Sequence, residues 1–164
     1  MKYSDFKNDA SYAKTLSREQ VEFLFYQENA DGTTSQLPIA RGESMSWNAS
    51  IEQFEVSEWG KDVIDEWADG KYRISGTVGL FFTPKGFDAL PNSQNFAGKY
   101  FRVIKRISSV HPTAAGTVLG MVENVKLNSK DFTANGGVVR TGIRFVASRE
   151  YSGDECEALG IVGG

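Results

Sequence analysis

One short segment of the chain, residues 72–82, limits the possible folds more than any other. Apolar side chains take most of its even-numbered positions: Tyr72, Ile74, Val78, Leu80 and Phe82. The positions between them are mostly polar, with Arg73, Ser75 and Thr77. A period of two residues is typical of an antiparallel strand that buries one face. The same alternation returns at residues 138–146, so we expect a mainly β, antiparallel protein.

The chain has 164 residues, a length that suits one domain with its own core. Its net charge of -3 indicates no basic patch of the kind on which nucleic-acid binders depend. Cys156 is the only cysteine, which excludes an intramolecular disulfide and a zinc site built from cysteines. The first residues lack the apolar core of a signal peptide, and no stretch approaches the ~18 apolar residues of a membrane span. We therefore expect no membrane segment.

The rest of the chain divides into further strands and the connections between them. Strand-forming residues cluster or alternate at residues 21–27, 37–42, 44–54, 99–109, 117–127 and 138–148. The connections include a turn at 29–36, a long acidic and aromatic loop at 55–70 with room for one helical turn, a short helix at 84–90 and a hairpin tip at 128–137. Residues 1–20 are predicted to be an amino-terminal arm and 152–164 a carboxy-terminal tail of one domain spanning 1–164.

Catalytic groups are scarce in this sequence. The single histidine, His111, precedes a proline in a predicted loop, where a surface residue is the simpler interpretation. Cys156 has acidic neighbours, which would raise its pKa rather than activate the thiol. Nucleophilic catalysis needs a nucleophile, a base and an orienting group together, and the sequence offers no such set. We expect no enzymatic activity, no metal and no cofactor.

The most conspicuous charged segment combines acids with tryptophans. Its acidic members are Asp62, Asp65, Glu66 and Asp69, flanked by Trp59 and Trp67. Their spacing does not match an EF-hand calcium loop, while a glycosidase acid pair beside a sugar-stacking tryptophan is an alternative. A solvated loop with aromatic anchors for a protein interface is the simpler interpretation. A small basic group on one strand (Arg102, Lys105 and Arg106) similarly indicates a solvated face or salt bridges between subunits.

The order of these elements resembles one protein family. An amino-terminal hairpin precedes a long loop, then Glu66-Trp67-Ala68-Asp69-Gly70, a long alternating strand and a helix-like insert ending near Leu90. Two further strands and the run Ser148-Arg149-Glu150-Tyr151-Ser152 close the pattern. This layout, over residues 20–152, resembles the major tail tube proteins of tailed bacteriophages. The resemblance implies a β-sandwich or barrel-like subunit with one short helix and long loops, a fold shared with the tubes of contractile injection systems.

The resemblance also implies a structural role and a set of partners. Subunits of such tubes form rings, commonly of six, that stack into a conduit for DNA delivery. The implied partners are other copies of the chain, a tail terminator, baseplate or tip proteins and a tape measure protein, with or without a surrounding sheath. DNA would pass through without specific binding, and the protein would be assembled in the host cytoplasm into the virion tail. Ring closure would also pair the open edges of the sheet.

Two sets of residues are predicted to carry these contacts. The inter-subunit set comes from the two long connections: Trp59, Glu66, Trp67, Asp69 and Phe132. The lumen-facing set consists of the acids Glu52 and Glu123, which would repel DNA phosphates and let the genome slide. Two alternatives remain: a monomeric β-sandwich that binds carbohydrate or another ligand through Trp47, Trp59 and Trp67, and a hydrolase that uses only the carboxylates of residues 62–69.

Overall fold

The computed structural model describes residues 1–9, 16, 20–36, 42–60, 63–64, 66–81, 99–135 and 138–161, and the structural statements below concern these residues. They contain the strands β1 (Val21–Glu28), β2 (Thr34–Gln36), β3 (Gly42–Val56), β4 (Glu66–Phe81), β5 (Phe101–Ile107), β6 (Val118–Asn135), β7 (Val138–Ala147) and β8 (Arg149–Ser152). Two short helices lie near the two ends of the chain: α1 (Tyr3–Asn8) and α3 (Gly153–Ala158).

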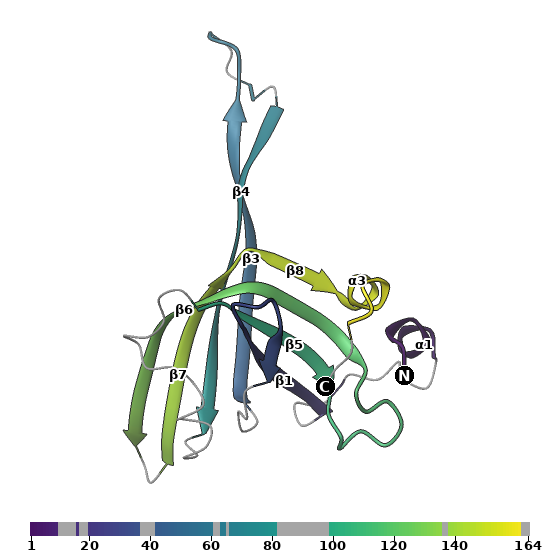
Figure 1. The fold of residues 1–164 in the computed structure, drawn as a ribbon. Helices are drawn as coiled ribbons and strands as arrows, with labels where there is room; N and C mark the ends of the chain where they lie inside the picture. Colours follow the sequence, from purple (N-terminus) through teal and green to yellow (C-terminus); the bar gives the residue numbers. More distant parts are fainter. Residues whose placement is uncertain are drawn as a thin grey trace.

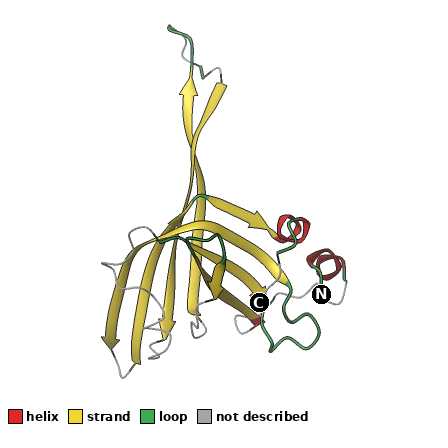
Figure 2. Ribbon diagram, viewed as in Figure 1, coloured by secondary structure: helices red, strands yellow, loops and turns green. Residues whose placement is uncertain are grey.

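The strands form one antiparallel sheet that curls into a half-barrel (Figure 1, Figure 2). They follow the order β2-β1-β5-β6-β7-β4-β3, and β8 pairs with β6 off this path. The predicted mainly β, antiparallel fold is therefore confirmed. The structure adds one feature that the alternation did not reveal: a single sheet folds over itself and encloses the core.

The long strand β6 joins the two parts of the curled sheet. Its first half pairs with β5 and β8, and its second half pairs with β7. Val122 pairs with Val103 of β5, and Val125 pairs with Phe101. Between these two pairs β6 advances three residues while β5 advances two, so β6 contains an extra residue. Asn124 lies there with a positive φ of 54°, a conformation that asparagine tolerates better than most residues. A bulge of this kind bends and twists its strand, which favours the curl of the sheet.

The concave side of the sheet holds the main hydrophobic core. Its largest fully buried side chains are Phe25, Phe101 and Phe145. In β4 the predicted alternation is confirmed, because Ile74 and Val78 belong to this core while Ser75 and Thr77 are exposed. The alternation also places Tyr72 on the buried face, but this side chain is 42% exposed. The reason is that β4 pairs with β7 only from Ile74 onward, so Tyr72 lies beyond the covered part of the sheet.

A smaller hydrophobic cluster lies on the convex side, beneath α3. Its buried members are Ile104, Val118, Met121 and Cys156. Ser152 caps α3 in a reciprocal capping box with Glu155, which fixes where the helix begins. The helix α1 lies beside α3, held by a salt bridge between Lys7 Nζ and Asp154 Oδ1 at 2.6 Å. Both helices fall in the segments predicted as polar arm and tail, where six residues are too few to show a helical period.

Several predicted connections are shorter than the sequence suggested. The predicted bounds of the 55–70 loop are wrong at both ends, because β3 continues to Val56 and β4 begins at Glu66. The described part of this segment contains no helical turn. The 128–137 tip is mostly the end of β6, and the 29–36 turn contains β2. The predicted helix at 84–90 and nearly all of the strand predicted at 37–42 lie outside the described residues.

Candidate assembly surface

The far parts of β3 and β4 project from the body as a narrow two-stranded ribbon (Figure 1). We call residues 50–73 the projecting hairpin. Within the described part of the chain, the strand residues of this segment pair only with each other, since β7 meets β4 from Ile74 to Phe81. An isolated two-stranded hairpin is marginally stable in water at best. The projecting hairpin therefore needs support from something outside the described subunit.

Large apolar side chains are exposed along the projecting hairpin. They are Ile51, Phe54, Val56, Trp59, Val63, Ile64, Trp67 and Tyr72. Trp59 at the tip is fully exposed, at 103%, and Trp67 is 58% exposed. Monomeric proteins expose few such contiguous patches, and larger ones mark interaction sites. The projecting hairpin is thus the strongest candidate in the described structure for contact with another protein.

One side of the projecting hairpin continues the core of the body. Directly opposed residues of paired strands share a face, so Ile51 lies with Tyr72 and Glu55 with Trp67. Their positions alternate in phase with Trp47, which packs against the main core. We call Ile51, Trp67 and Tyr72 the apolar stripe. It extends the buried face of the sheet to a place where the described subunit offers no cover.

Glu150 on β8 holds the root of the projecting hairpin. Trp47 Nε1 donates to Glu150 Oε1 at 2.8 Å, and the Tyr72 hydroxyl donates to Glu150 Oε2 at 3.3 Å. Desolvation and the negative charge of Glu150 raise the pKa of Tyr72 above its ordinary value, so the phenol remains a donor. One carboxylate therefore ties β3 and β4 to β8 at the level where β7 stops supporting them. This arrangement sets the direction in which the hairpin leaves the body.

Four of the five predicted inter-subunit residues lie together on the projecting hairpin. Trp59 is at its tip, and Glu66, Trp67 and Asp69 are exposed on its β4 arm. Phe132 instead lies in β6, opposite Thr141 of β7, in another part of the sheet. The segment is acidic, with seven acidic and three basic residues between 52 and 73. Among the described residues, no group of acids, histidines or cysteine is arranged to hold a metal ion.

The two predicted lumen-facing acids both lie on the convex side of the sheet. Glu52 alternates with exposed polar residues of β3, and Glu123 alternates with Met121 beneath α3. Each has a cationic partner in the same subunit, Arg73 at 3.0 Å for Glu52 and Arg102 at 3.1 Å for Glu123. Their charges are therefore partly compensated.

Each cation of the basic group on β5 has a partner within the subunit, although Arg102 Nε is buried without a hydrogen bond to any described residue. Arg102 binds Glu123, Arg106 binds Glu22, and Lys105 lies over the Trp47 ring at 5.1 Å from its centroid. Salt bridges between subunits are thus not needed to explain these three cations. Arg102 and Arg106 link β5 to its neighbours β6 and β1, whereas Lys105 contacts β3 at the other edge of the sheet.

The three tryptophans of the ligand-binding alternative do not form one site. Trp47 lies in the body, where it packs against the core, while Trp59 and Trp67 lie on the projecting hairpin. Eight strand residues separate Trp47 from Glu55, the partner of Trp67, which corresponds to roughly 26 Å at the usual rise per residue. A carbohydrate site shared by all three is therefore excluded.

His111 and Cys156 have structural roles. His111 is buried rather than on the surface, and its Nδ1 accepts hydrogen bonds from the backbone N–H groups of Ala114 at 3.0 Å and Thr113 at 3.3 Å. This histidine therefore organises the turn before β6. Burial and the neighbouring Glu155 raise the pKa of the Cys156 thiol, as predicted. No described helix is long and apolar enough to cross a membrane.

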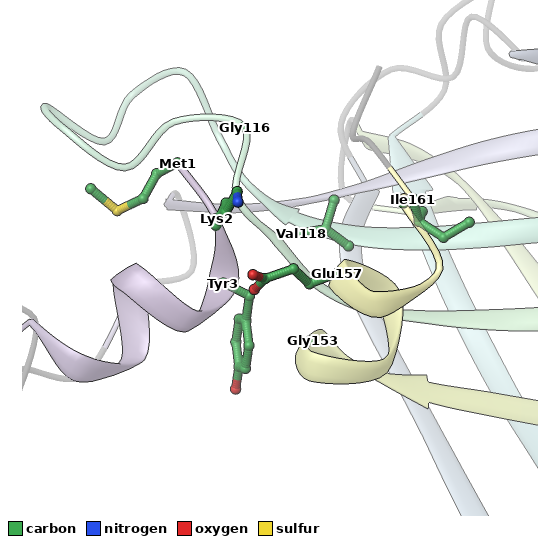
Figure 3. Close-up of a pocket in the computed structure, with 9 residues that line it drawn as sticks. Met1, Lys2, Tyr3, Gly116, Val118, Gly153, Glu157 and Ile161 are labelled. Atoms are coloured by element: carbon green, nitrogen blue, oxygen red, sulfur yellow. The ribbon is translucent and has the colours of Figure 1, made fainter.

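A second feature, which the sequence did not reveal, is a cavity between the two helices (Figure 3). Its volume is about 360 Å³, and it is lined by Met1, Lys2, Tyr3, Gly116, Val118, Gly153, Glu157, Gly160 and Ile161. These residues come from three distant parts of the chain, so no local sequence pattern predicts the cavity. Two of the lining residues, Gly153 and Gly160, stand at the two ends of a short polar segment. This pair of glycines is the one indication of the cavity in the sequence.

Comparison with solved structures places this fold among tail and baseplate proteins. The SPP1 tail tube aligns with a TM-score of 0.61 at 16% identity, over 84% of this chain and 78% of that one. The tail of an empty gene transfer agent particle aligns with a TM-score of 0.52 at 11% identity, over 85% and 98%. The baseplate of the anti-feeding prophage gives 0.52 at 10% identity, over 84% and 94%. No protein-family model and no curated protein sequence matches the chain.

These likenesses cover most of the chain and most of each neighbour. At such low identity they establish the fold and not the individual contacts. The chain therefore has the fold of tail tube proteins, as the order of its elements predicted.

Proposed function

We propose that this protein is a structural tube subunit that assembles with copies of itself into stacked rings, forming a tail tube for DNA delivery. The observation that carries this proposal is the projecting hairpin, a ribbon with exposed apolar residues that the described subunit leaves uncovered. Its tail tube fold supports the same conclusion. We propose a non-enzymatic role, which the similarity to structural tail tube proteins supports.

The geometry of the projecting hairpin favours a head-to-tail contact. The hairpin and the surface that receives it would be different parts of the same chain, which defines a heterologous interface. Such an interface closes into rings or continues into a tube, depending on the rotation between subunits. Six subunits per ring is our proposal, supported by the sixfold symmetry stated for the anti-feeding prophage baseplate and the C6 symmetry stated for the gene transfer agent tail.

Trp59 and Trp67 are the proposed anchors of the ring-to-ring contact. Buried aromatic residues dominate the energy of protein interfaces, and both side chains are available on the projecting hairpin. Glu66 and Asp69 would form the polar rim around them. Phe132, on the second half of β6, would contribute to a separate contact.

The convex side of β3, β4 and β7 is the proposed lining of the lumen. Its β3 and β4 strands present mainly small uncharged polar side chains, Ser46, Asn48, Ser50, Ser75 and Thr77, and β7 adds the exposed Arg144 opposite Thr77. DNA carries one charge per ~1.7 Å of its axis, so a lining rich in cations would retain it. A lining with few cations, in which Arg144 lies among uncharged side chains and Glu52 lies beside Arg73 at the edge, would let DNA pass. Glu123 lies on the same side, but its carboxylate is engaged by Arg102 and by the Tyr151 hydroxyl.

The proposed location is the tail of a virion or of a related particle, after assembly in the host cytoplasm. A tube has two ends and a lumen, so its subunits would also meet a tail terminator, baseplate or tip proteins and a tape measure protein. A surrounding sheath is compatible with this arrangement. Residues 1–164 would act as one domain, with the segment that contains α1 and the segment that contains α3 packed together on its flank.

Electron microscopy of the purified protein tests the proposal directly. We expect rings or tubes in negative stain, and a sedimentation coefficient that rises with protein concentration. The chain alone has a mass of 18.1 kDa. A particle that remains at this mass across the accessible concentrations, with no rings or tubes, would contradict self-assembly.

A further inference from the structure

The cavity between α1, α3 and the turn before β6 has the walls of an aromatic-binding site. The Tyr3 ring forms one wall, and it can lie so close to α3 only because residue 153 is glycine, where a Cβ would come within 2.5 Å of the ring. Val118 and Ile161 supply aliphatic surface opposite (Figure 3). Gly116 and Gly160 also line the cavity, and a Cβ at either would meet nothing within 4 Å. The cavity volume of about 360 Å³ leaves room for one aromatic side chain.

One acceptor and one cation complete the cavity. The Glu157 carboxylate accepts hydrogen bonds from the Ser4 backbone N–H and hydroxyl, each at 2.8 Å, one to each oxygen. A carboxylate oxygen can accept more than one hydrogen bond, so Glu157 retains capacity for a further donor. Lys2 also lines the cavity and provides positive charge at its edge. The cavity therefore suits a ring that carries one N–H donor and is flanked by acids.

We infer that this cavity receives Trp59 from a second copy of the chain. The indole is planar and apolar, and its single N–H needs an acceptor when it is buried. Trp59 is fully exposed at the tip of the projecting hairpin, where Gly60 with φ of 85° forms the turn. The hairpin segment is acidic, and Lys2 is the cation in the cavity lining, where it already faces Glu157. This inference rests on the proposed self-assembly and names the surface that the hairpin meets.

The positions of tip and cavity make the contact intermolecular. In Figure 1 the tip of the hairpin lies at the far end of a long ribbon, well away from α1 and α3. A tip and a cavity that cannot meet within one chain produce a contact that propagates from copy to copy. Each subunit would then donate one tryptophan and accept one.

Crosslinking between engineered cysteines tests this contact. Ser57→Cys places a thiol beside the tip without removing Trp59, and Leu159→Cys places one on an exposed residue next to Gly160 of the cavity lining, so Lys2 is kept. The native Cys156 is fully buried, so it adds little background reaction. With a short bismaleimide we expect the double variant to form a ladder at multiples of 18.1 kDa, while each single variant stays uncrosslinked. Adding Trp59→Ala should reduce the yield of the ladder about tenfold or more.

Electron microscopy of the same samples separates the outcomes. Tubes without a ladder would overturn the cavity inference and leave the proposed function in place. A ladder that persists at full yield with Trp59→Ala would also overturn it, because another contact would then hold the chains together. Neither tubes nor a ladder would contradict both proposals.

A charge reversal tests the same contact independently of the crosslinking. Lys2→Glu should weaken assembly, because it places a negative charge against the acidic tip. Adding Glu58→Lys, next to Trp59, should restore assembly at least in part. If the double reversal is no better than Lys2→Glu alone, Lys2 does not face the tip.

Discussion

The body of the sheet and the projecting hairpin are built from the same two strands but differ in what covers them. Along β4, Ile74 and Val78 are each 1% exposed because β7 and the curled sheet cover them. A few residues earlier, Tyr72 and Trp67 lie on the same face, because an irregularity in the pairing between them changes the phase of the alternation, and both are exposed. The difference teaches that alternation predicts a strand and its faces. Only the number of neighbouring strands decides whether the apolar face is buried within the subunit.

The largest expected effect compares one phenylalanine from each region. Phe145→Ala should lower the free energy of unfolding by about 3–5 kcal/mol, because it leaves a cavity in the core where Phe145 is 1% exposed. Phe54→Ala should change it by less than about 1 kcal/mol, because Phe54 is 54% exposed on the hairpin. Urea denaturation of both variants measures the contrast. Equal losses would show that the hairpin is packed as tightly as the body.

The next-largest effect concerns assembly rather than folding, and here the hairpin should matter more than the body. Trp59→Ala and Trp67→Ala should each weaken assembly by about 2 kcal/mol or more, roughly thirtyfold, if they anchor the interface. The same variants should change the free energy of unfolding of the monomer by only about 0.5 kcal/mol, as is usual for exposed sites. Sedimentation measures the first quantity and urea denaturation the second. Normal tubes in both variants would refute the assignment of these anchors.

A smaller effect concerns the junction between the regions. Glu150→Ala should remove both hydrogen bonds at the root of the hairpin, at a cost of about 1 kcal/mol in assembly, while leaving the core intact. Removing this charge should also lower the pKa of Tyr72 toward its ordinary value, because Glu150 contributes to raising it. Ultraviolet titration of the tyrosines follows this shift. Glu150→Gln is the intermediate variant, since its amide oxygen keeps one of the two acceptors while the charge and the second acceptor are lost.

The smallest effect is on the flank, where α1 meets α3. Hydrogen bonds from Ser4 lower the pKa of Glu157 below its ordinary 4.5, so this contact is at full strength above that pH and weakens as the pH falls through the lowered value. The Lys7 pKa is raised above its ordinary 10.5 by Asp154, so the lysine's side of that pair is at full strength below this pH and weakens as the pH rises through the raised value. Hydrogen exchange in residues 3–8 should therefore be slow at neutral pH, after correction for intrinsic rates, and faster in acid. Unchanged protection in acid would show that apolar contacts alone hold α1.

Much of the fold could be predicted from local patterns, and the exceptions have physical causes. The alternation at Ile74 and Val78 indicated β4 because one face of that stretch is buried. The segment around Asp69 and Gly70 was interpreted as a turn, since a ribbon without neighbours tolerates polar residues and glycine that a central strand would not. There the Phe54 ring occupies the space where a side chain on Gly70 would lie.

The candidate site was predictable only in part. Exposed tryptophans among acids indicated an interface, and Trp59 and Trp67 do lie on the projecting hairpin. The cavity that we assign to Trp59 could not be predicted, because Tyr3, Val118 and Glu157 meet only after the chain has folded. Likewise, nothing in the sequence around Glu150 showed that its carboxylate would reach Trp47 and Tyr72.

The bulge in β6 has a mechanical consequence. This strand pairs with β5 and β8 up to Val125 and with β7 from Lys126 onward, and β7 in turn pairs with β4. A force applied at the tip of the hairpin is therefore carried as shear across neighbouring ladders of hydrogen bonds to the strand that supports α3. Shear loads many hydrogen bonds at once, whereas peeling would break them one by one. A filament of such subunits would resist being pulled apart along its length and still bend at each slender ribbon.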